Sequence, residues 1–316
     1  MKRSLSTVFM GTSRFATPIL QSLYDHYGLV AVVTQPDRPS GRGRVISMPE
    51  VKQRALELDV PVHQPERVKD ASLVDTIRGM NPELVVVAAY GQILPRSLLK
   101  IPPMGCINVH GSLLPKYRGA APIHWALARG ESETGVTTML MDEGMDTGPV
   151  FLSRVVPIHP EDTAGSLSER LAAAGAALVI ETIEGLKRGD LHPTPQDGRQ
   201  ATYAPPFKKK DGWMTWSEPA RMLHHRIRAV TPWPGAFTRL RGRMLKIFWA
   251  EVDEKPGGKQ QPGCVVDVGA EGIRVATGKG HIILKDVQLE GKKRLPVHEF
   301  LLGYRVEAGT MLGNGP

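Results

Sequence analysis

The sequence contains no apolar stretch that reaches the roughly 18–20 residues of a membrane-spanning helix, so we do not expect a membrane protein. It contains only 2 cysteines, Cys106 and Cys264, which lie far apart in apolar, strand-like runs. This spacing favours two buried free thiols over a disulfide and is typical of a cytoplasmic protein. A short basic start precedes an apolar run that ends at Gly11, which we interpret as a first strand and not as a signal peptide.

Signatures of metal and dinucleotide binding are also absent. None of the 10 histidines occurs in a His-Glu-x-x-His pattern, and there is no Cys-x-x-Cys pair, so we predict no metal site. The turn after the first predicted strand, residues 11–15, reads Gly-Thr-Ser-Arg-Phe. It lacks the second and third glycines of Gly-x-Gly-x-x-Gly, which argues against a dinucleotide cofactor and favours a tight turn close to a ligand.

The two parts of the chain differ in charge. Residues 1–200 contain 21 Lys or Arg and 21 Asp or Glu, a balance of zero. Residues 201–316 contain 19 Lys or Arg and 11 Asp or Glu, so the whole net charge of +8 lies in this part. Charge alone leaves two interpretations open, a nucleic-acid partner bound by the basic part or a basic surface that only keeps the protein soluble.

A chain of 316 residues with 41% hydrophobic content is long for one domain and sufficient for two packed cores. Residues 1–189 alternate strand-like and helix-like segments, which predicts an α/β domain with a Rossmann-like parallel sheet. The predicted strands are Leu5–Met10, Leu29–Thr34, Leu84–Ala89, Cys106–Val109, Gly135–Met141 and Val150–Ile158. The predicted helices are Phe15–Tyr27, Pro49–Leu58, Ala71–Met80, Ala121–Ala128 and Ala164–Lys187.

Residues 190–210 are rich in proline and poor in apolar residues, so we predict a linker there. Residues 211–316 contain one predicted helix, Pro219–Val230, followed by short β-branched runs between Gly-rich turns. This pattern predicts a small, OB-like β-barrel as the second domain, and the charge balance makes it the basic one.

The predicted strand Cys106–Val109 leads into a Gly-rich loop and carries the main candidates for catalysis. Residues two apart on a strand face the same side, so Asn108 and His110 are expected side by side. They combine a neutral hydrogen-bond donor with a proton carrier, which suits the stabilisation of an oxyanion and the movement of a proton. Asp146 lies in a second loop, residues 142–149, and a carboxylate beside an imidazole fixes its tautomer.

The run from Asn108 to Gly119 reads Asn-x-His-x-Ser-Leu-Leu-Pro-x-x-Arg-Gly, and the second loop contains Asp-Thr-Gly. Together they resemble the folate-dependent formyltransferases, and the likeness to the methionyl-tRNA formyltransferases extends over nearly the full chain. It weakens around residues 206–215. The resemblance implies an enzyme that transfers a formyl group from 10-formyltetrahydrofolate to the α-amine of initiator methionyl-tRNA, with Asn108, His110 and Asp146 as catalytic residues.

The resemblance also implies a folate site built from two strand-end segments and one residue of the acidic loop. The residues concerned are Ala89, Tyr90, Gly91, Gln92, Ile93, Leu94, Ser112, Leu113, Leu114, Pro115 and Asp142. Residues 35–44 resemble the loop that methionyl-tRNA formyltransferases place against the tRNA acceptor arm, and arginines suit phosphate contacts. The expected tRNA-binding residues are Arg38, Arg42, Arg44, Lys208, Lys209 and Lys210. A monomer is expected.

Three other functions compete with this one. Formyltransferases that act on nucleotide-linked amino sugars share the Asn108–Pro115 pattern but lack the arginine-rich loop at residues 35–44. Glycinamide ribonucleotide formyltransferases lack a basic second domain. An RNA-binding protein with a retired enzyme domain would not need Asn108, His110 and Asp146 together.

Overall fold

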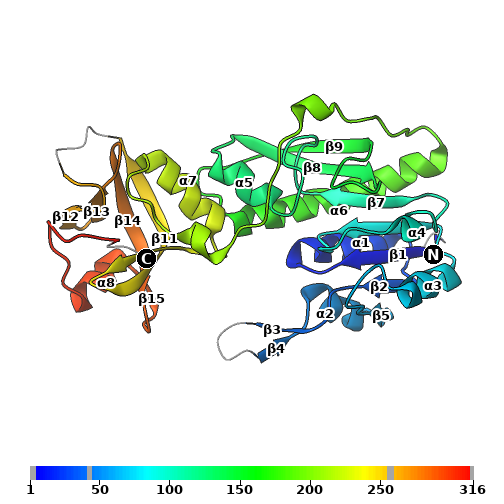
Figure 1. Cartoon of the computed structure of the whole chain (residues 1–316), viewed down its shortest axis with the longest axis horizontal. Coiled ribbons are helices and arrows are strands. Elements are labelled where there is room, and N and C mark those ends of the chain that lie inside the picture. The colour runs from blue at the N-terminus through cyan, green and yellow to red at the C-terminus, as the bar shows by residue number, and fades with distance from the viewer. Residues whose placement is uncertain (1–4, 41–44, 255–259, 314–316) are drawn as a thin grey trace. The chain divides into compact units, whose positions relative to one another are not determined.

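The computed structural model describes residues 5–40, 45–254 and 260–313. The chain forms two compact units (Figure 1). The first comprises Met1–Pro122, Glu133–Pro157 and Ser168–Pro205, and the second comprises Ile123–Ser132, Ile158–Leu167 and Pro206–Pro316. Residues 190–205 of the predicted linker therefore lie in the first unit, and residues 206–210 lie in the second.

The first unit is built on a seven-stranded sheet in the order β5-β2-β1-β6-β7-β8-β9. The bounds are Thr7–Gly11 (β1), Ala31–Val33 (β2), Val62–His63 (β5), Leu84–Ala88 (β6), Cys106–His110 (β7), Glu133–Leu140 (β8) and Val150–Pro157 (β9). The predicted α/β class is confirmed. The strands from β5 to β7 are parallel, as expected, but β8 and β9 run antiparallel to their neighbours, which the alternation of segments did not predict.

Helices cover both faces of this sheet (Figure 1). Their bounds are Thr17–His26 (α1), Glu50–Glu57 (α2), Ala71–Met80 (α3), Arg96–Leu99 (α4) and Ala164–Arg188 (α6). Because side chains alternate along a strand, Phe9 of β1 packs with α1 and α6 in one core, whereas Val8 and Met10 pack with α3 and α4 in another. A short hairpin of β3 (Arg38–Ser40) and β4 (Val45–Ser47) follows β2 and was not predicted.

The second unit contains an antiparallel sheet in the order β10-β11-β14-β13-β12, with β15 paired to β14. The bounds are Ala236–Leu240 (β10), Arg243–Asp253 (β11), Val265–Gly269 (β12), Gly272–Ala276 (β13), His281–Leu289 (β14) and Arg294–Pro296 (β15); the helices are Pro122–Ala128 (α5), Ala220–Val230 (α7) and Val297–Gly303 (α8). Single bridges from Leu312 to Leu240 and from Met311 to Cys264 connect the two ends of the sheet, so it closes as a small barrel.

The two cysteines are free thiols. Cys106 is buried in the sheet, and burial raises the pKa of its thiol to about 12. The expectation of burial is wrong for Cys264, which is only half-buried because it lies one residue before β12, at the edge of the barrel. Among the described residues, no helix combines the length and the apolar character that crossing a membrane requires.

Candidate active site

The strand β7 places Asn108 and His110 on one face of the sheet. Ile107 and Val109, which alternate with them, pack into the core on the opposite face. The side chains of Asn108 and His110 are therefore directed away from that core, yet both residues are more than nine-tenths buried. The strand thus places a neutral amide and an imidazole together in a largely water-excluded position, where hydrogen bonds are stronger than in water.

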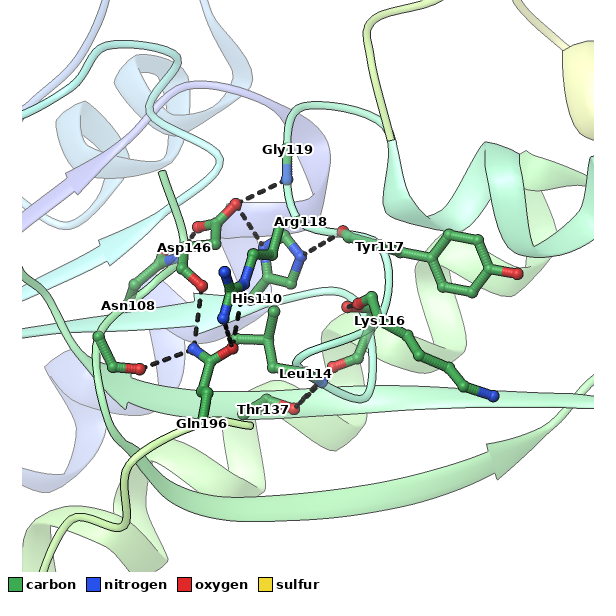
Figure 2. Close-up of polar contacts among 12 residues, drawn as sticks. Asn108, His110, Leu114, Lys116, Tyr117, Arg118, Gly119, Thr137, Asp146 and Gln196 are labelled. Atoms are coloured by element: carbon green, nitrogen blue, oxygen red, sulfur yellow. Dashed lines mark hydrogen bonds and ion pairs between the residues drawn. The ribbon is translucent and has the colours of Figure 1, made fainter. Parts of the chain in front are cut away.

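Asp146 joins this pair from the loop between β8 and β9 (Figure 2). Its Oδ1 accepts a hydrogen bond from Asn108 Nδ2 at 3.3 Å, and its Oδ2 lies 3.6 Å from His110 Nδ1. The loop starts beside the beginning of β7, where the N–H of Met141 donates to the carbonyl of Cys106, and then folds back across the Asn108 face. The structure brings together all three residues that the sequence predicted as catalytic.

The second ring nitrogen of His110 determines its tautomer. His110 Nε2 lies 3.0 Å from the carbonyl oxygen of Tyr117. Because a carbonyl can only accept, Nε2 must carry a hydrogen, and Nδ1 is the nitrogen that gains or loses a proton. At 3.6 Å the Nδ1–Asp146 contact is too long for a hydrogen bond, so Nδ1 stays available to a reacting group while the carboxylate lies beside it.

Left-handed backbone conformations fix the two loops that meet at the site. Tyr117 and Asp146 have φ values of 62° and 54°, and Gly119 has a φ of 121°. The N–H of Gly119 donates to Asp146 Oδ2 at 2.8 Å. A Cβ at Gly119 would lie 2.8 Å from the carbonyl oxygen of Ala204, so only glycine lets the chain pass this close.

The segment Ser112–Pro115, predicted to bind folate, is held by hydrogen bonds on both sides. Thr137 of β8 donates through Oγ1 to the carbonyl of Ser112 at 2.7 Å and accepts from the N–H of Leu114 at 3.2 Å. Ser112 Oγ donates to the carbonyl of Lys116 at 2.6 Å. The side chains of Ser112 and Thr137 therefore shape this turn, and Leu113 packs against Gly135 of β8.

The second predicted folate segment, residues 89–94, follows β6 at the same sheet edge where β7 ends, because the two strands are parallel. The carbonyl of Tyr90 accepts hydrogen bonds from Thr12 at 3.0 Å and from Gln35 at 3.2 Å. Burial raises the pKa of the Tyr90 phenol to about 12. Ala89 and Gly91 on either side have φ values of 45° and 89°, so the backbone turns sharply here.

The remaining folate candidates have separate roles. Gln92 is fixed by two backbone contacts, from Oε1 to the N–H of Val68 at 2.8 Å and from Nε2 to the carbonyl of Glu66 at 3.2 Å. Leu94 is buried, whereas Ile93 is exposed. Asp142 closes its own loop, since its Oδ1 accepts from the N–H of Gly144 and from Thr147 Oγ1.

Two residues of the site, Arg118 and Gln196, were not predicted as functional. Gln196 donates through Nε2 to the carbonyls of Asp146 and Gly148, at 2.9 and 2.7 Å. Its Oε1 accepts from Arg118 Nε and Nη2, at 3.1 and 2.7 Å (Figure 2). Arg118 belongs to the motif at residues 108–119, but Gln196 lies in the segment predicted as a linker, where no local pattern indicates a contact.

The predicted tRNA contacts that the structure describes are exposed basic side chains. Arg38 lies on β3, with Nη2 at 3.4 Å from Glu66 Oε2. Arg42 and Arg44 lie outside the described residues. Lys208, Lys209 and Lys210 are all exposed and belong to the second unit. In the part of the chain that the structure describes, no group of His, Cys, Asp and Glu side chains is arranged to hold a metal ion.

Comparison with known proteins gives the same family for both parts of the chain. Residues 3–183 match the formyl transferase family, and residues 206–305 match the formyl transferase C-terminal domain. The methionyl-tRNA formyltransferase of Pelobacter propionicus is 50% identical over 311 residues, which cover 98% of this chain and 97% of the relative. The methionyl-tRNA formyltransferase of Trichlorobacter lovleyi is 47% identical over 306 residues, which cover 96% of each chain.

Solved structures share the fold at low identity. The sugar 3N-formyl transferase WlaRD, crystallised with dTDP and 5-N-formyl-THF, aligns with a TM-score of 0.66 at 17% identity, over 92% of this chain and 100% of its own. HypX from Aquifex aeolicus, in complex with tetrahydrofolic acid, aligns with a TM-score of 0.62 at 20% identity. That match covers 97% of this chain and 50% of HypX, so this chain corresponds to about half of that protein.

Proposed function

Because this chain belongs to the formyl transferase family, and within it to the methionyl-tRNA formyltransferases, we propose that it formylates the α-amine of initiator methionyl-tRNA. The formyl donor is 10-formyltetrahydrofolate. The attacking amine nitrogen forms a bond to the formyl carbon, the bond from that carbon to N10 of the folate breaks, and tetrahydrofolate leaves. One proton is lost by the amine and one is gained by N10, so the reaction needs no oxidant or reductant.

The convergence of Asn108, His110 and Asp146 is the observation that carries this proposal. These residues come from two chain segments. Asn108 Nδ2 lies 3.3 Å from Asp146 Oδ1, and His110 Nδ1 lies 3.6 Å from Asp146 Oδ2. An amide, an imidazole and a carboxylate supply an oxyanion donor, a proton carrier and a base in one place. An acyl transfer from a folate amide to an amine requires these three functions.

Asn108 and His110 face the oxyanion that forms when the amine attacks. Asn108 Nδ2 has two hydrogens, of which Asp146 Oδ1 accepts one, so the other remains for the developing negative charge. In its protonated form His110 contributes a hydrogen on Nδ1, since the hydrogen on Nε2 is donated to the carbonyl of Tyr117. Donors that are already oriented before the reaction need no reorganisation at the transition state.

Asp146 and His110 divide the proton transfers between them. The Asp146 carboxylate, directly or through a water, takes the proton that the attacking nitrogen loses. His110 supplies the proton that N10 gains as it leaves, from the same Nδ1 that faces Asp146. Asn108 and Gly119 hold the carboxylate at its two oxygens, so its position is fixed throughout the reaction.

The folate donor lies along the two strand-end segments, residues 89–94 and 112–115. Both follow parallel neighbouring strands, and ligands of open α/β sheets bind at that edge. The polar side chains of Gln92 and Ser112 are engaged in internal hydrogen bonds and most of the other side chains are apolar, so backbone groups provide the polar contacts to the pterin ring. The exposed Ile93 offers apolar surface at the same place.

The tRNA is held by basic residues of both units. The C-terminal part carries the whole excess charge of +8, and the exposed run Lys208–Lys210 begins it. In the N-terminal part, Arg38 and the neighbouring Arg42 and Arg44 contact the acceptor arm. Such contacts depend on phosphate charge, so affinity for tRNA should fall steeply with salt.

The test is a formylation assay with purified initiator methionyl-tRNA and 10-formyltetrahydrofolate. Wild-type protein should transfer the formyl group, and His110→Ala or Asp146→Ala should lower kcat by about 10²–10⁴-fold while the fold is retained. His192→Ala, which removes an exposed histidine of the same unit, serves as the matched control. Transfer to a nucleotide-linked amino sugar but not to methionyl-tRNA, or near-normal kcat in either active-site variant, contradicts the proposal.

A further inference from the structure

Gln196 uses all of its hydrogen-bonding capacity at the site. Its two amide hydrogens go to the carbonyls of Asp146 and Gly148, and both lone pairs of its oxygen are taken by Arg118. A guanidinium can only donate and a carbonyl can only accept, so the amide has one possible orientation. These hydrogen bonds connect Gln196 to the backbone of the loop that contains Asp146, residues 142–149 (Figure 2).

Arg118 keeps Gln196 in place from the other side. Its side chain is largely buried, with 7% of the residue exposed, and its planar fork meets Oε1 through two nitrogens. The segment around Gln196 is anchored independently, because Thr194 and Val150 exchange both backbone hydrogen bonds at 2.8 Å. Gln196 therefore lies in a segment whose backbone is itself held by hydrogen bonds to Val150.

The Asp146 loop needs such a support. Asp146 has a φ of 54°, a conformation that is costly for a residue with a Cβ, and lies outside any strand. Gly119 and Asn108 hold its carboxylate, but these contacts do not fix its backbone. The two hydrogen bonds from Gln196 hold the carbonyls of Asp146 and Gly148, on either side of Thr147. They therefore determine the position of the Asp146 carboxylate.

We propose that Gln196 is a positioning residue for formyl transfer, which fixes the Asp146–Gly148 backbone so that the Asp146 carboxylate stays between Asn108, His110 and Gly119. The role rests on the proposed function for its effect on rate. The hydrogen-bonding groups of the Gln196 side chain are all engaged within the protein, so Gln196 acts through Asp146 and not by contact with the substrate. A shift of about 1 Å in a catalytic group can cost about 10²-fold in rate.

Two substitutions isolate the two donated hydrogen bonds. Gln196→Glu keeps an oxygen for Arg118 but cannot donate to the two carbonyls, and Gln196→Met is neutral and likewise cannot donate. An effect shared by both variants therefore belongs to the bonds and not to the added charge. Gln200→Glu is the matched control, because Gln200 is exposed in the same segment and its side chain donates to Asp197.

Steady-state kinetics with methionyl-tRNA provide the first readout. Both Gln196 variants should lower kcat by about 10–100-fold, while KM for methionyl-tRNA changes by less than about threefold. In an Asp146→Asn background, where the carboxylate is absent, the same Gln196 changes should have almost no further effect. Equal decreases in both backgrounds, or a change confined to KM, would overturn the positioning role.

Amide hydrogen exchange of residues 142–149 in the full-length protein provides the second readout, and it does not depend on activity. Exchange there should be faster in both Gln196 variants and unchanged in Gln200→Glu. If wild-type protein fails to formylate methionyl-tRNA, the proposed function is wrong, and the exchange experiment alone decides whether Gln196 holds the loop. Unchanged exchange in the Gln196 variants would refute the inference.

Discussion

Replacement of Gly119 by alanine perturbs the site through backbone geometry alone. Gly119 has a φ of 121°, and its N–H donates to Asp146 Oδ2 at 2.8 Å. A Cβ added there would lie 2.8 Å from the carbonyl oxygen of Ala204, which also accepts a hydrogen bond from Ala121 at 3.1 Å. Gly119→Ala must therefore displace either residue 119 or the segment around Ala204.

The expected destabilisation combines two costs. A residue with a Cβ held at such a φ is strained by about 1–3 kcal/mol, and an extra carbon in a packed site costs about 1–3 kcal/mol. Relaxation relieves part of both, so the free energy of unfolding should fall by about 2–4 kcal/mol. Because the displaced N–H no longer reaches Asp146, we also expect kcat to fall by about 10²-fold in the folded variant.

Urea denaturation followed by circular dichroism measures the first effect, and formylation kinetics below the unfolding transition measure the second. Gly189→Ala is the control, since Gly189 has a φ of 77° but nothing within 4 Å of its added Cβ. Its free energy of unfolding should fall by only about 1 kcal/mol, and its kcat should stay normal. If Gly119→Ala is as stable as Gly189→Ala and equally active, the close approach at Ala204 does not constrain the site.

Three further predictions concern other parts of the molecule. Burial, reinforced by neighbouring Arg228, lowers the pKa of His224 from 6.5 to about 4. The contribution of the neutral His224 side chain to folding stability is therefore complete above about pH 6.5 and is lost as the pH falls toward 4. The free energy of unfolding of wild-type protein should therefore fall relative to that of His224→Gln by up to roughly 3 kcal/mol over that range. An equal difference between the two proteins in urea denaturation at about pH 7 and at about pH 4.5 would contradict this. Thr137→Val should weaken folate binding about tenfold, because it removes the hydrogen bonds that hold the turn at residues 112–115. Thr138→Val, at an equally buried residue that is bonded to Thr182, should leave folate binding unchanged, and equilibrium titration with folate measures both. Replacement of Lys208–Lys210 by glutamine should reduce the slope of log K for tRNA against log salt by about one unit for each phosphate that is no longer neutralised, measured by filter binding; an unchanged slope would exclude these lysines from the tRNA interface.

The sequence by itself determined the positions of most of the longer elements and the first half of the site. Periodicity located β7, α3 and α7 to within a residue or two, because apolar spacing follows directly from the geometry of a strand or helix. The same alternation predicted that Asn108 and His110 share a face. The motif around them indicated the family, and the charge balance separated a basic C-terminal part from a neutral N-terminal one.

The tertiary structure decided what depends on contacts between distant residues. The antiparallel direction of β8 and β9 has no local signal, because a strand has the same side-chain alternation in either direction. Gln196 looked like part of a polar linker, yet its partners lie 78 residues away at Arg118 and 50 and 48 residues away in the Asp146 loop. Local propensity describes only neighbours within a turn or a strand, so bonds over such separations form only when the sheet has placed the loops side by side.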